Sequence, residues 1–567
     1  MDIKKKRLLI AAISMIIWAA CVYFGYVSYD VNDDAGMNMV AAGAYGPITH
    51  NLVHMNVVHG YVLKVLYAIF PFVNCYLWSF LVCDLLAVMG FAMVVTDKLR
   101  TYPAVVITVA INLILASDFY VHIQFTKSSA LYVSVGLVML IWQMKKTVRE
   151  KSMLALSYFF IILGLSIRWE SFLLALPVVL GALIVDELYE LVIKKNKIDF
   201  KKYTLTIIPI AVCIVIALIN HVSNSADPGW AEFRKTEEVL SPMRDFNRYV
   251  YSDSPEEYQA AGFTETDFEM VKGYWMWDDT EQFNSERLCA LADIGEKYAK
   301  SYVRFDASYI KLTIKEVLSA LTGKHIAMAF AVVLVLALLT ADLNVILQML
   351  YMIVVSMGEI YYFFCLERVL WRAELCIWLT ILMMGGYLVS RFAGKGKEQL
   401  SPQRDVPSRK YVLSYVAMAV CVLVLILVKS IVVDNSRFTN GDNRYDEFVE
   451  LTKLEGVHFV CYNKAEYGVL QGADNIFAID RRYAGYYENM SDLGGFAFAP
   501  FDQYYGVQKG ITNPIRALFE RDDVYYLGDE APLQCLGQFI SEKYGVDVDW
   551  EPVTFGQTTA WKCVTSN

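Results

Sequence analysis

The chain has 567 residues and a formal net charge of −9; 56% of its residues are hydrophobic and only 19% are charged. Soluble domains average about 25% charged and about 45–50% apolar residues, so this composition excludes an ordinary soluble protein. The negative charge argues against nucleic acid as a partner. The apolar residues are gathered in blocks of about 16–24, close to the length that crosses a bilayer. The sequence therefore predicts an α-helical polytopic membrane protein.

The apolar blocks predict about eleven membrane spans. The first follows a basic N-terminus and is too long for the apolar core of a cleavable signal peptide. Residues 53–70 are apolar enough to span, but we expect an interfacial or re-entrant helix there, because an extra span would separate the basic segments. The spans are predicted over residues 8–27, 74–96, 102–118, 121–143, 152–167, 171–191, 203–221, 325–341, 344–364, 371–391 and 410–433.

Positive charge orients these spans. All the basic segments fall on one side of the predicted topology, which the positive-inside rule assigns to the cytoplasm. We therefore expect a multi-pass cell-membrane protein with a cytoplasmic N-terminus and an extracytoplasmic C-terminal domain. The basic segments are residues 1–7, 97–100, 145–151, 194–202 and 391–410.

The predicted topology divides the chain into four parts. Residues 1–221 form an N-terminal membrane module whose outer loops carry the candidate chemistry, and residues 222–324 form an extracytoplasmic, mostly helical segment. Residues 325–433 return to the membrane. Residues 434–567 alternate β-rich runs with a helical pattern, which predicts a small extracytoplasmic α/β domain.

An acidic pair, Asp33 and Asp34, follows the first span directly. One interpretation is that both acids cap a helix at the water interface, with Asn32 as the N-cap residue, since a helix N-terminus favours carboxylates. The other is that one of them is a general base at the outer face of the membrane, deprotonating a hydroxyl as it attacks.

The second outer loop contains Asp118, followed by His122 and Lys127. An acid, an imidazole and an ammonium at one membrane depth rarely face lipid. They could form a local cluster that fixes the loop. Alternatively, Asp118 and His122 orient an acceptor or a metal ion, and Lys127 binds a phosphate.

Three arginines interrupt the later apolar runs. Arg168 precedes Glu170 at a break between two spans, and Arg368 and Arg372 lie before another span. An i,i+4 spacing puts Arg368 and Arg372 on one face if that helix begins early. Guanidinium groups are good clamps for phosphate, although they also anchor lipid headgroups. We therefore predict that Arg168, Arg368 and Arg372 bind a lipid phosphate.

Several familiar motifs are absent from the sequence. It contains no Walker loop, no dinucleotide-binding glycine pattern, no HExxH and no paired CxxC. ATP-driven transport, dinucleotide redox chemistry and zinc proteolysis are therefore disfavoured.

The chain resembles the GT-C superfamily of membrane glycosyltransferases in four features. These are the acidic pair after the first span, a second acid between spans three and four, polar breaks on the same face and a C-terminal tail on the outer side. Those families have an Asp-Glu or similar pair where this chain has Asp33-Asp34. The resemblance covers roughly residues 1–435. It implies transfer of a sugar, with inversion, from a polyprenyl-phosphate carrier to an extracytoplasmic glycan, lipid or protein acceptor. A divalent cation shared by Asp33 and Asp118 is compatible with it.

Two other functions remain open at this point. A polysaccharide polymerase or O-antigen-ligase-like protein would also have many spans, a large outer loop and functional arginines. A non-enzymatic transporter or scaffold is the second alternative, although transporters usually have paired halves. The acidic pair favours the transferase.

Overall fold

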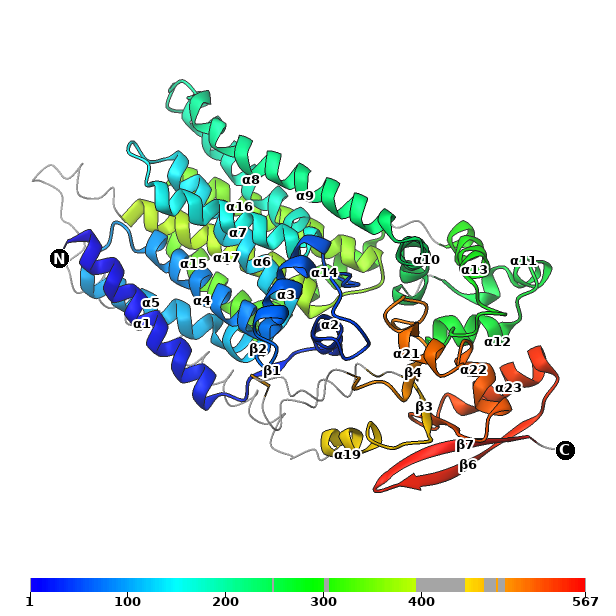
Figure 1. The fold of residues 1–567 in the computed structure, drawn as a ribbon. Coiled ribbons are helices and arrows are strands. Elements are labelled where there is room, and N and C mark those ends of the chain that lie inside the picture. Colours follow the sequence, from blue (N-terminus) through cyan, green and yellow to red (C-terminus); the bar gives the residue numbers. More distant parts are fainter. Residues whose placement is uncertain are drawn as a thin grey trace, which may run out of the picture.

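A computed structural model describes residues 2–246, 249–299, 305–393, 444–462, 464, 476–477 and 485–565. The predicted span 410–433 and most of the linker 391–409 lie outside these residues. Long helices form one bundle, and shorter helices and a mixed β-sheet lie at one end of it (Figure 1). We call this the soluble end of the bundle.

The bundle consists of long helices that coincide with the apolar runs. A helix satisfies its own backbone hydrogen bonds, which is why an apolar run takes this form in lipid. The helices are α1 (Ile3–Phe24), α4 (Cys75–Val95), α5 (Thr101–Ala116), α6 (Phe125–Met144), α7 (Lys151–Ile167), α8 (Trp169–Val192), α9 (Ile207–Ala226), α15 (His325–Leu339), α16 (Leu343–Cys365) and α17 (Trp371–Ala393).

Eight described helices are long and apolar enough to cross a bilayer. A ninth span arises if α14 (Ala307–Gly323) and α15 count as one, although they are bent by 89°. The prediction of about eleven also counted α7, which has only 17 residues, and the run 410–433. The fold class is confirmed: this is a helical polytopic membrane protein with a C-terminal mixed-sheet domain.

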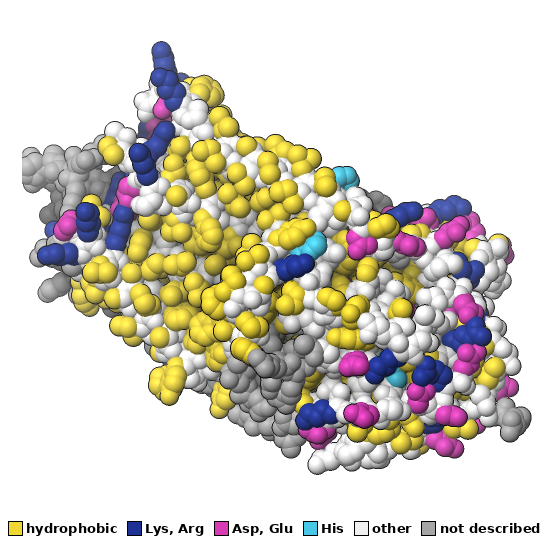
Figure 2. All heavy atoms as spheres, in the orientation of Figure 1, with side chains coloured by type: hydrophobic (Ala, Val, Ile, Leu, Met, Phe, Trp, Pro, Cys, Tyr) yellow, Lys and Arg dark blue, Asp and Glu magenta, His cyan; other side chains and the backbone are white. Residues whose placement is uncertain are grey.

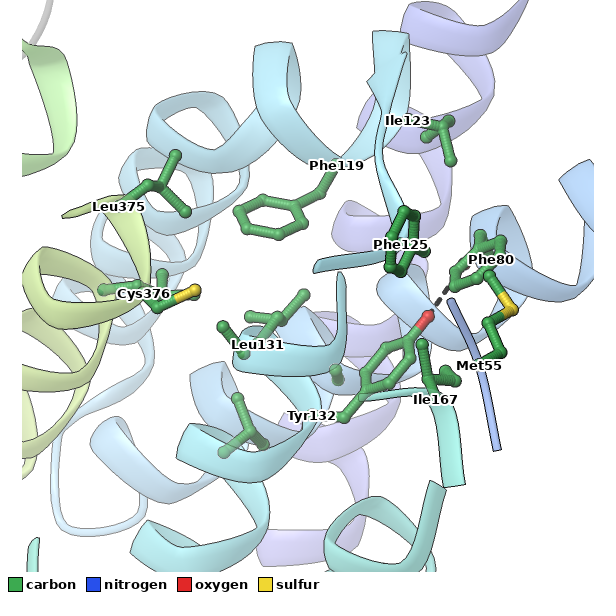
Figure 3. Packing of buried hydrophobic residues seen from close by; sticks show 14 of the residues in the cluster. Met55, Phe80, Phe119, Ile123, Phe125, Leu131, Tyr132, Ile167, Leu375 and Cys376 are labelled. Carbon is green, nitrogen blue, oxygen red and sulfur yellow. Dashed lines mark hydrogen bonds between the residues drawn. The ribbon is translucent and has the colours of Figure 1, made fainter. Parts of the chain in front are cut away.

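Burial within the bundle follows the position of each helix. The spanning window of α6 is completely buried, whereas α1 and α9 expose most of their apolar side chains. Figure 2 shows this surface as a broad hydrophobic area over the bundle, with charged side chains at its two ends. Around α6 the core is close-packed, with Phe125 and Tyr132 near Phe80 and Ile167 and with Leu131 on the side of Leu375 and Cys376 (Figure 3). The bundle therefore faces lipid with its outer helices and water with its ends.

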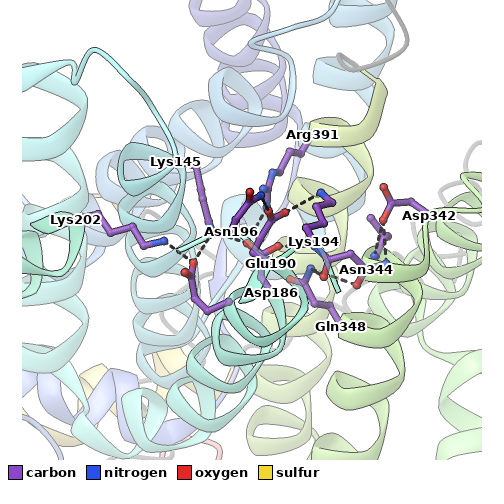
Figure 4. A network of polar contacts seen from close by, with 12 residues as sticks. Lys145, Asp186, Glu190, Lys194, Asn196, Lys202, Asp342, Asn344, Gln348 and Arg391 are labelled. Carbon is purple, nitrogen blue, oxygen red and sulfur yellow. Dashed lines mark hydrogen bonds and ion pairs between the residues drawn. The ribbon is translucent and has the colours of Figure 1, made fainter. Parts of the chain in front are cut away.

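The end of the bundle opposite the soluble end is held by ion pairs (Figure 4). Lys145 Nζ lies 2.5 Å from Asp186 and 2.6 Å from Glu187, and Lys202 lies 2.6 Å from Glu187. Arg391 lies 3.0 Å from Asp186. These contacts join α6, α8, α17 and the 3₁₀ turn Phe200–Thr206.

The N-terminal basic residues reach the same end. Lys6 Nζ donates to the carbonyls of Thr96 and Asp97 at 3.0 and 2.7 Å. Lys146 lies 3.3 Å from the Asp97 carboxylate. Described residues of four basic segments, and Arg391 of the fifth, thus lie at one end of the bundle.

The run 53–70 forms the helix α3 (Val57–Ile69). Its 13 residues extend roughly 20 Å, which is shorter than the hydrocarbon core. Asn56 caps its N-terminus through Val58 N. The helix therefore does not cross the bilayer by itself.

The soluble end has two parts. Helices α10 (Pro228–Asp245), α11 (Pro255–Ala260), α12 (Glu265–Phe268) and α13 (Ser285–Tyr298) lie between α9 and α14. The tail adds a five-stranded sheet in the order β4-β3-β5-β7-β6, parallel where β3 pairs with β4 and β5 and antiparallel elsewhere. The remaining tail elements are β3 (His458–Cys461), β4 (Met490–Asp492), β5 (Val524–Leu527), β6 (Val548–Phe555), β7 (Thr558–Thr565), α19 (Arg444–Leu451), α21 (Gln503–Gln508), α22 (Pro514–Glu520) and α23 (Leu533–Tyr544).

Candidate functional site

Two short strands bring the first and second outer loops together. Strand β1 (Ser28–Tyr29) pairs in parallel with β2 (His122–Ile123). The Ser28 hydroxyl lies 3.1 Å from His122 Nδ1. His122 therefore helps to join the loops, and helix α2 (Asn32–Ala42) begins beside the start of α6.

Asp33 lies in the first turn of α2 with its side chain 29% exposed. Its carboxylate lies 3.5 Å from Arg372 and 3.9 Å from His54 Nε2. His54 stacks on the Phe125 ring, and the ring centroids are 6.2 Å apart. Burial lowers the pKa of His54, and Asp33 opposes that shift. A solvated carboxylate thus faces a guanidinium and an imidazole.

Asp34, the other member of the acidic pair, is completely buried. Its Oδ1 accepts hydrogen bonds from the Tyr76 hydroxyl at 2.8 Å and from Phe125 N at 2.9 Å. Burial raises the pKa of this carboxyl well above its usual value. Asp34 therefore ties α2 to α4 and α6, and of the acidic pair only Asp33 is partly exposed.

Asp118 belongs to a second, more buried cluster. It lies in the π-helical turn Ser117–Val121, and its two oxygens lie 3.0 Å from Lys127 and 2.7 Å from His325. Lys127 is only 1% exposed and also lies 3.3 Å from Asp30. Two carboxylates already compensate the Lys127 ammonium, so this lysine joins helices. The phosphate contact predicted for Lys127 stays a prediction, and these two ion pairs do not support it.

Arg168 completes the cluster around Phe125. Its guanidinium lies 5.3 Å from the Phe125 ring, and Nη1 lies 3.3 Å from the Thr126 hydroxyl. Arg168 also acts electrostatically on His54, lowering its pKa. Asp33, His54, Arg168 and Arg372, all partly exposed, thus gather at the soluble end of the bundle.

Arg368 and Arg372 do not share a helix face as the sequence predicted. Glu367 has a positive φ of 54°, which separates α16 from α17, and α17 begins only at Trp371. Arg368 forms an ion pair with Asp245 at the end of α10, whereas Arg372 faces Asp33. The two guanidiniums therefore serve different contacts.

The residues considered for a metal ion do not fit one. Asp33 faces Arg372 and His54, and Asp118 faces Lys127 and His325. Cations at these distances compete with a divalent ion for the same oxygens. Across the described part of the chain, no group of three acidic, histidine or cysteine side chains is arranged to hold a metal.

Sequence reasoning missed His54 and His325. A signal for His54 exists, because three of the seven histidines, His50, His54 and His59, lie within one stretch of ten residues in the loop region after the acidic pair. His325 carried no such signal, since it opens an apolar helix far along the chain.

No family model and no curated protein sequence matches the chain. Solved structures of ArnT from Cupriavidus metallidurans match in overall fold. The structure bound to undecaprenyl phosphate has a TM-score of 0.42 and the apo structure 0.41. Each match has 10% sequence identity and covers 98% of this chain and 97% of the other.

Proposed function

We propose that the protein is a membrane glycosyltransferase that moves a sugar from a polyprenyl-phosphate carrier to an extracytoplasmic acceptor. The observation that carries the proposal is the partly exposed Asp33 carboxylate 3.5 Å from Arg372, where the bundle meets the soluble part. The basic segments lie together at the opposite end, which the positive-inside rule assigns to the cytoplasm. The site accordingly faces away from the cytoplasm.

Arg372 is the phosphate-binding group in this proposal, with Arg168 beside it. A guanidinium offers a planar set of donors that matches phosphate oxygens, and it stabilises the charge that develops as the phosphate leaves. A bound phosphate competes with Asp33 for Arg372, so binding of the donor releases the carboxylate from its ion pair. Arg368 has no part in this step, because it is paired with Asp245.

Asp33 is the general base. It takes the proton of an acceptor hydroxyl whose oxygen forms a bond to the anomeric carbon. The bond between that carbon and the phosphate oxygen breaks, and polyprenyl phosphate leaves with the electron pair. The transition state resembles an oxocarbenium ion, and attack from the opposite face inverts the configuration. Because its pKa is lowered, His54 is neutral at pH 7. It therefore does not offset the negative charge of the Asp33 carboxylate.

An apolar cavity in the bundle favours a lipid-linked donor over a soluble one. It has a volume of about 230 Å³ and lies between α4, α5, α15 and α17, with Ile111, Val333 and Met383 in its wall. Helix α15 begins at His325, which contacts Asp118. A hydrocarbon chain can occupy this space while its phosphate reaches the soluble end.

The test is a transfer assay with the full chain in lipid nanodiscs. Polyprenyl-phosphate-linked hexoses and pentoses serve as donors, with a cell-envelope extract as the acceptor source. We expect that one of the donors releases polyprenyl phosphate. The release should require the acceptor, and the Asp33→Asn variant should not show it. Transfer of whole glycan chains from polyprenyl diphosphate, with none from the monophosphate sugars, would instead identify a polymerase or ligase.

A further inference from the structure

A second cavity lies in the soluble part, outside the candidate active site. It has a volume of about 570 Å³, within the range of about 300–1,000 Å³ typical of small-molecule sites. One wall is the face of α10 that carries Glu232 and Phe233. The other walls come from the start of α13, at Asn284, and from the tail around Gln503 and Tyr504. The 222–324 segment and the tail thus form it jointly.

A smaller chamber of about 200 Å³ adjoins this cavity. Thr280, Gln503 and Val507 line both spaces, so the two form one cleft. The smaller chamber continues inward to Asp278 and Asp502. We call the combined space the tail cleft.

Asp278 at the inner end of the tail cleft has an unusual environment. Asp278 is only 2% exposed, and its Oδ1 has no hydrogen-bond partner. The neighbouring Asp279 is the reverse: its oxygens accept from Glu281 N, Gln282 N, Asn513 and the Tyr544 hydroxyl. A buried polar atom without a hydrogen bond has lost its contact with water and gained none in return, which is unfavourable. Asp278 therefore lies in the wall of the smaller chamber with a carboxyl oxygen whose hydrogen-bonding capacity the fold leaves unused.

The charges of the tail cleft restrict its ligand. Asp227 and Glu232 lie in the wall of the larger chamber, and Asp278 and Asp502 in that of the smaller one. Of the described residues that line either chamber, none is Lys, Arg or His. The Lys464 ammonium bonded to Asp502 at 2.6 Å is itself buried behind the wall. In the wall of the larger chamber, Asp227 and Glu232 are exposed and form no ion pair with a described residue, so a phosphate, a sulfate or an acidic sugar would meet negative charge there.

The uncharged groups that line the cleft can both donate and accept hydrogen bonds. Asn284, Gln503 and Gln508 offer amide groups that donate and accept, and the hydroxyls of Thr280 and Tyr504 do the same. Such groups match hydroxyls, which also donate and accept, better than they match an ammonium group that only donates. This separates a sugar from a lysine-rich peptide.

We infer that the tail cleft binds a neutral oligosaccharide, with a sugar hydroxyl donating to Asp278. The binding step requires neither Asp33 nor a lipid-linked donor, so it stands or falls independently of the proposed sugar transfer. The ligand fills the larger chamber and reaches the smaller one past Thr280 and Val507.

The test is isothermal titration of the full chain in nanodiscs, without donor. The probes are linear tetrasaccharides of glucose, mannose, galactose and N-acetylglucosamine, with tetragalacturonate and tetralysine as charged comparisons. We expect binding of at least one neutral probe. Asp278→Asn should weaken it, and Val507→Trp, which narrows both chambers from an exposed position, should weaken it by about tenfold or more. Val250→Trp is the control, because Val250 is exposed outside the cleft.

Three results would overturn the inference. The first is that none of the four neutral tetrasaccharides binds the wild-type chain. The second is that Val507→Trp binds as tightly as Val250→Trp. The third is tighter binding of tetragalacturonate or tetralysine than of every neutral probe, which would identify a different class of ligand.

Discussion

Replacing Asp33 by Asn separates a catalytic from a structural role for this carboxylate. The ion pair with Arg372 is 3.5 Å long and the Asp33 side chain is 29% exposed. Exposed pairs of this kind contribute about 0.2–1 kcal/mol. A general base contributes a factor of about 10²–10⁴ in rate, which is about 2.7–5.5 kcal/mol of barrier. We therefore expect Asp33→Asn to lower the transfer rate by that factor while leaving the fold almost unchanged.

The assay is single-turnover sugar transfer in nanodiscs, with thermal unfolding measured on the same preparation. Glu170→Gln is the matched control, since Glu170 is also a partly exposed carboxylate, 3.6 Å from the guanidinium of Arg168. It should behave as the wild-type chain in both measurements. The reasoning is refuted if Asp33→Asn transfers sugar at a rate close to that of Glu170→Gln.

Three further outcomes follow from the described contacts. Arg372→Ala should raise the KM for the donor more than Arg372→Lys does, because the lysine keeps the charge and loses only the planar fork; equal KM values would contradict this. Lys127→Met should lower the free energy of unfolding by about 3–5 kcal/mol, measured by thermal denaturation, because it leaves the buried Asp118 without one of its two partners; an unchanged unfolding temperature would contradict it. Burial lowers the pKa of His458 to about 3, whereas an unfolded histidine titrates near 6.5. The unfolded tail then binds the extra proton first, so its stability falls as the pH drops from about 6.5 towards 3. Proteolysis of the tail should accelerate over this range in the wild-type chain and less in His458→Gln, and equal acceleration would refute the assignment.

The helices of the membrane part could be predicted from sequence because each is encoded locally. An apolar run of about 20 residues has few other ways to satisfy its backbone in lipid. The sequence also predicted that the basic segments lie on one side of the membrane, and their described residues do lie at one end of the bundle. The length of α7 and the bend between α14 and α15 were not evident, since hydropathy does not report where a helix ends or turns.

The candidate site was only partly predictable because its contacts join distant parts of the chain. Asp33 and Arg372 could each be singled out by type and position, but their proximity depends on how α2 and α17 pack. The sequence also did not indicate which way the Lys127 side chain points, because α6 is surrounded by other helices and every face of it is buried. Glu367 has a left-handed backbone conformation that places Arg368 and Arg372 in different contacts, and nothing in the sequence indicates that conformation.

The ion pairs at the far end of the bundle also bear on how a large lipid substrate enters. They fasten α6, α8 and α17 to one another, and their carboxylates are almost fully buried. Separating these helices there would strand charges, which costs several kcal/mol per ion. At the opposite end, Arg168 at the start of α8 and Arg372 in α17 are partly exposed. The charged end therefore keeps α6, α8 and α17 together in any movement that admits a large lipid substrate between helices of the bundle.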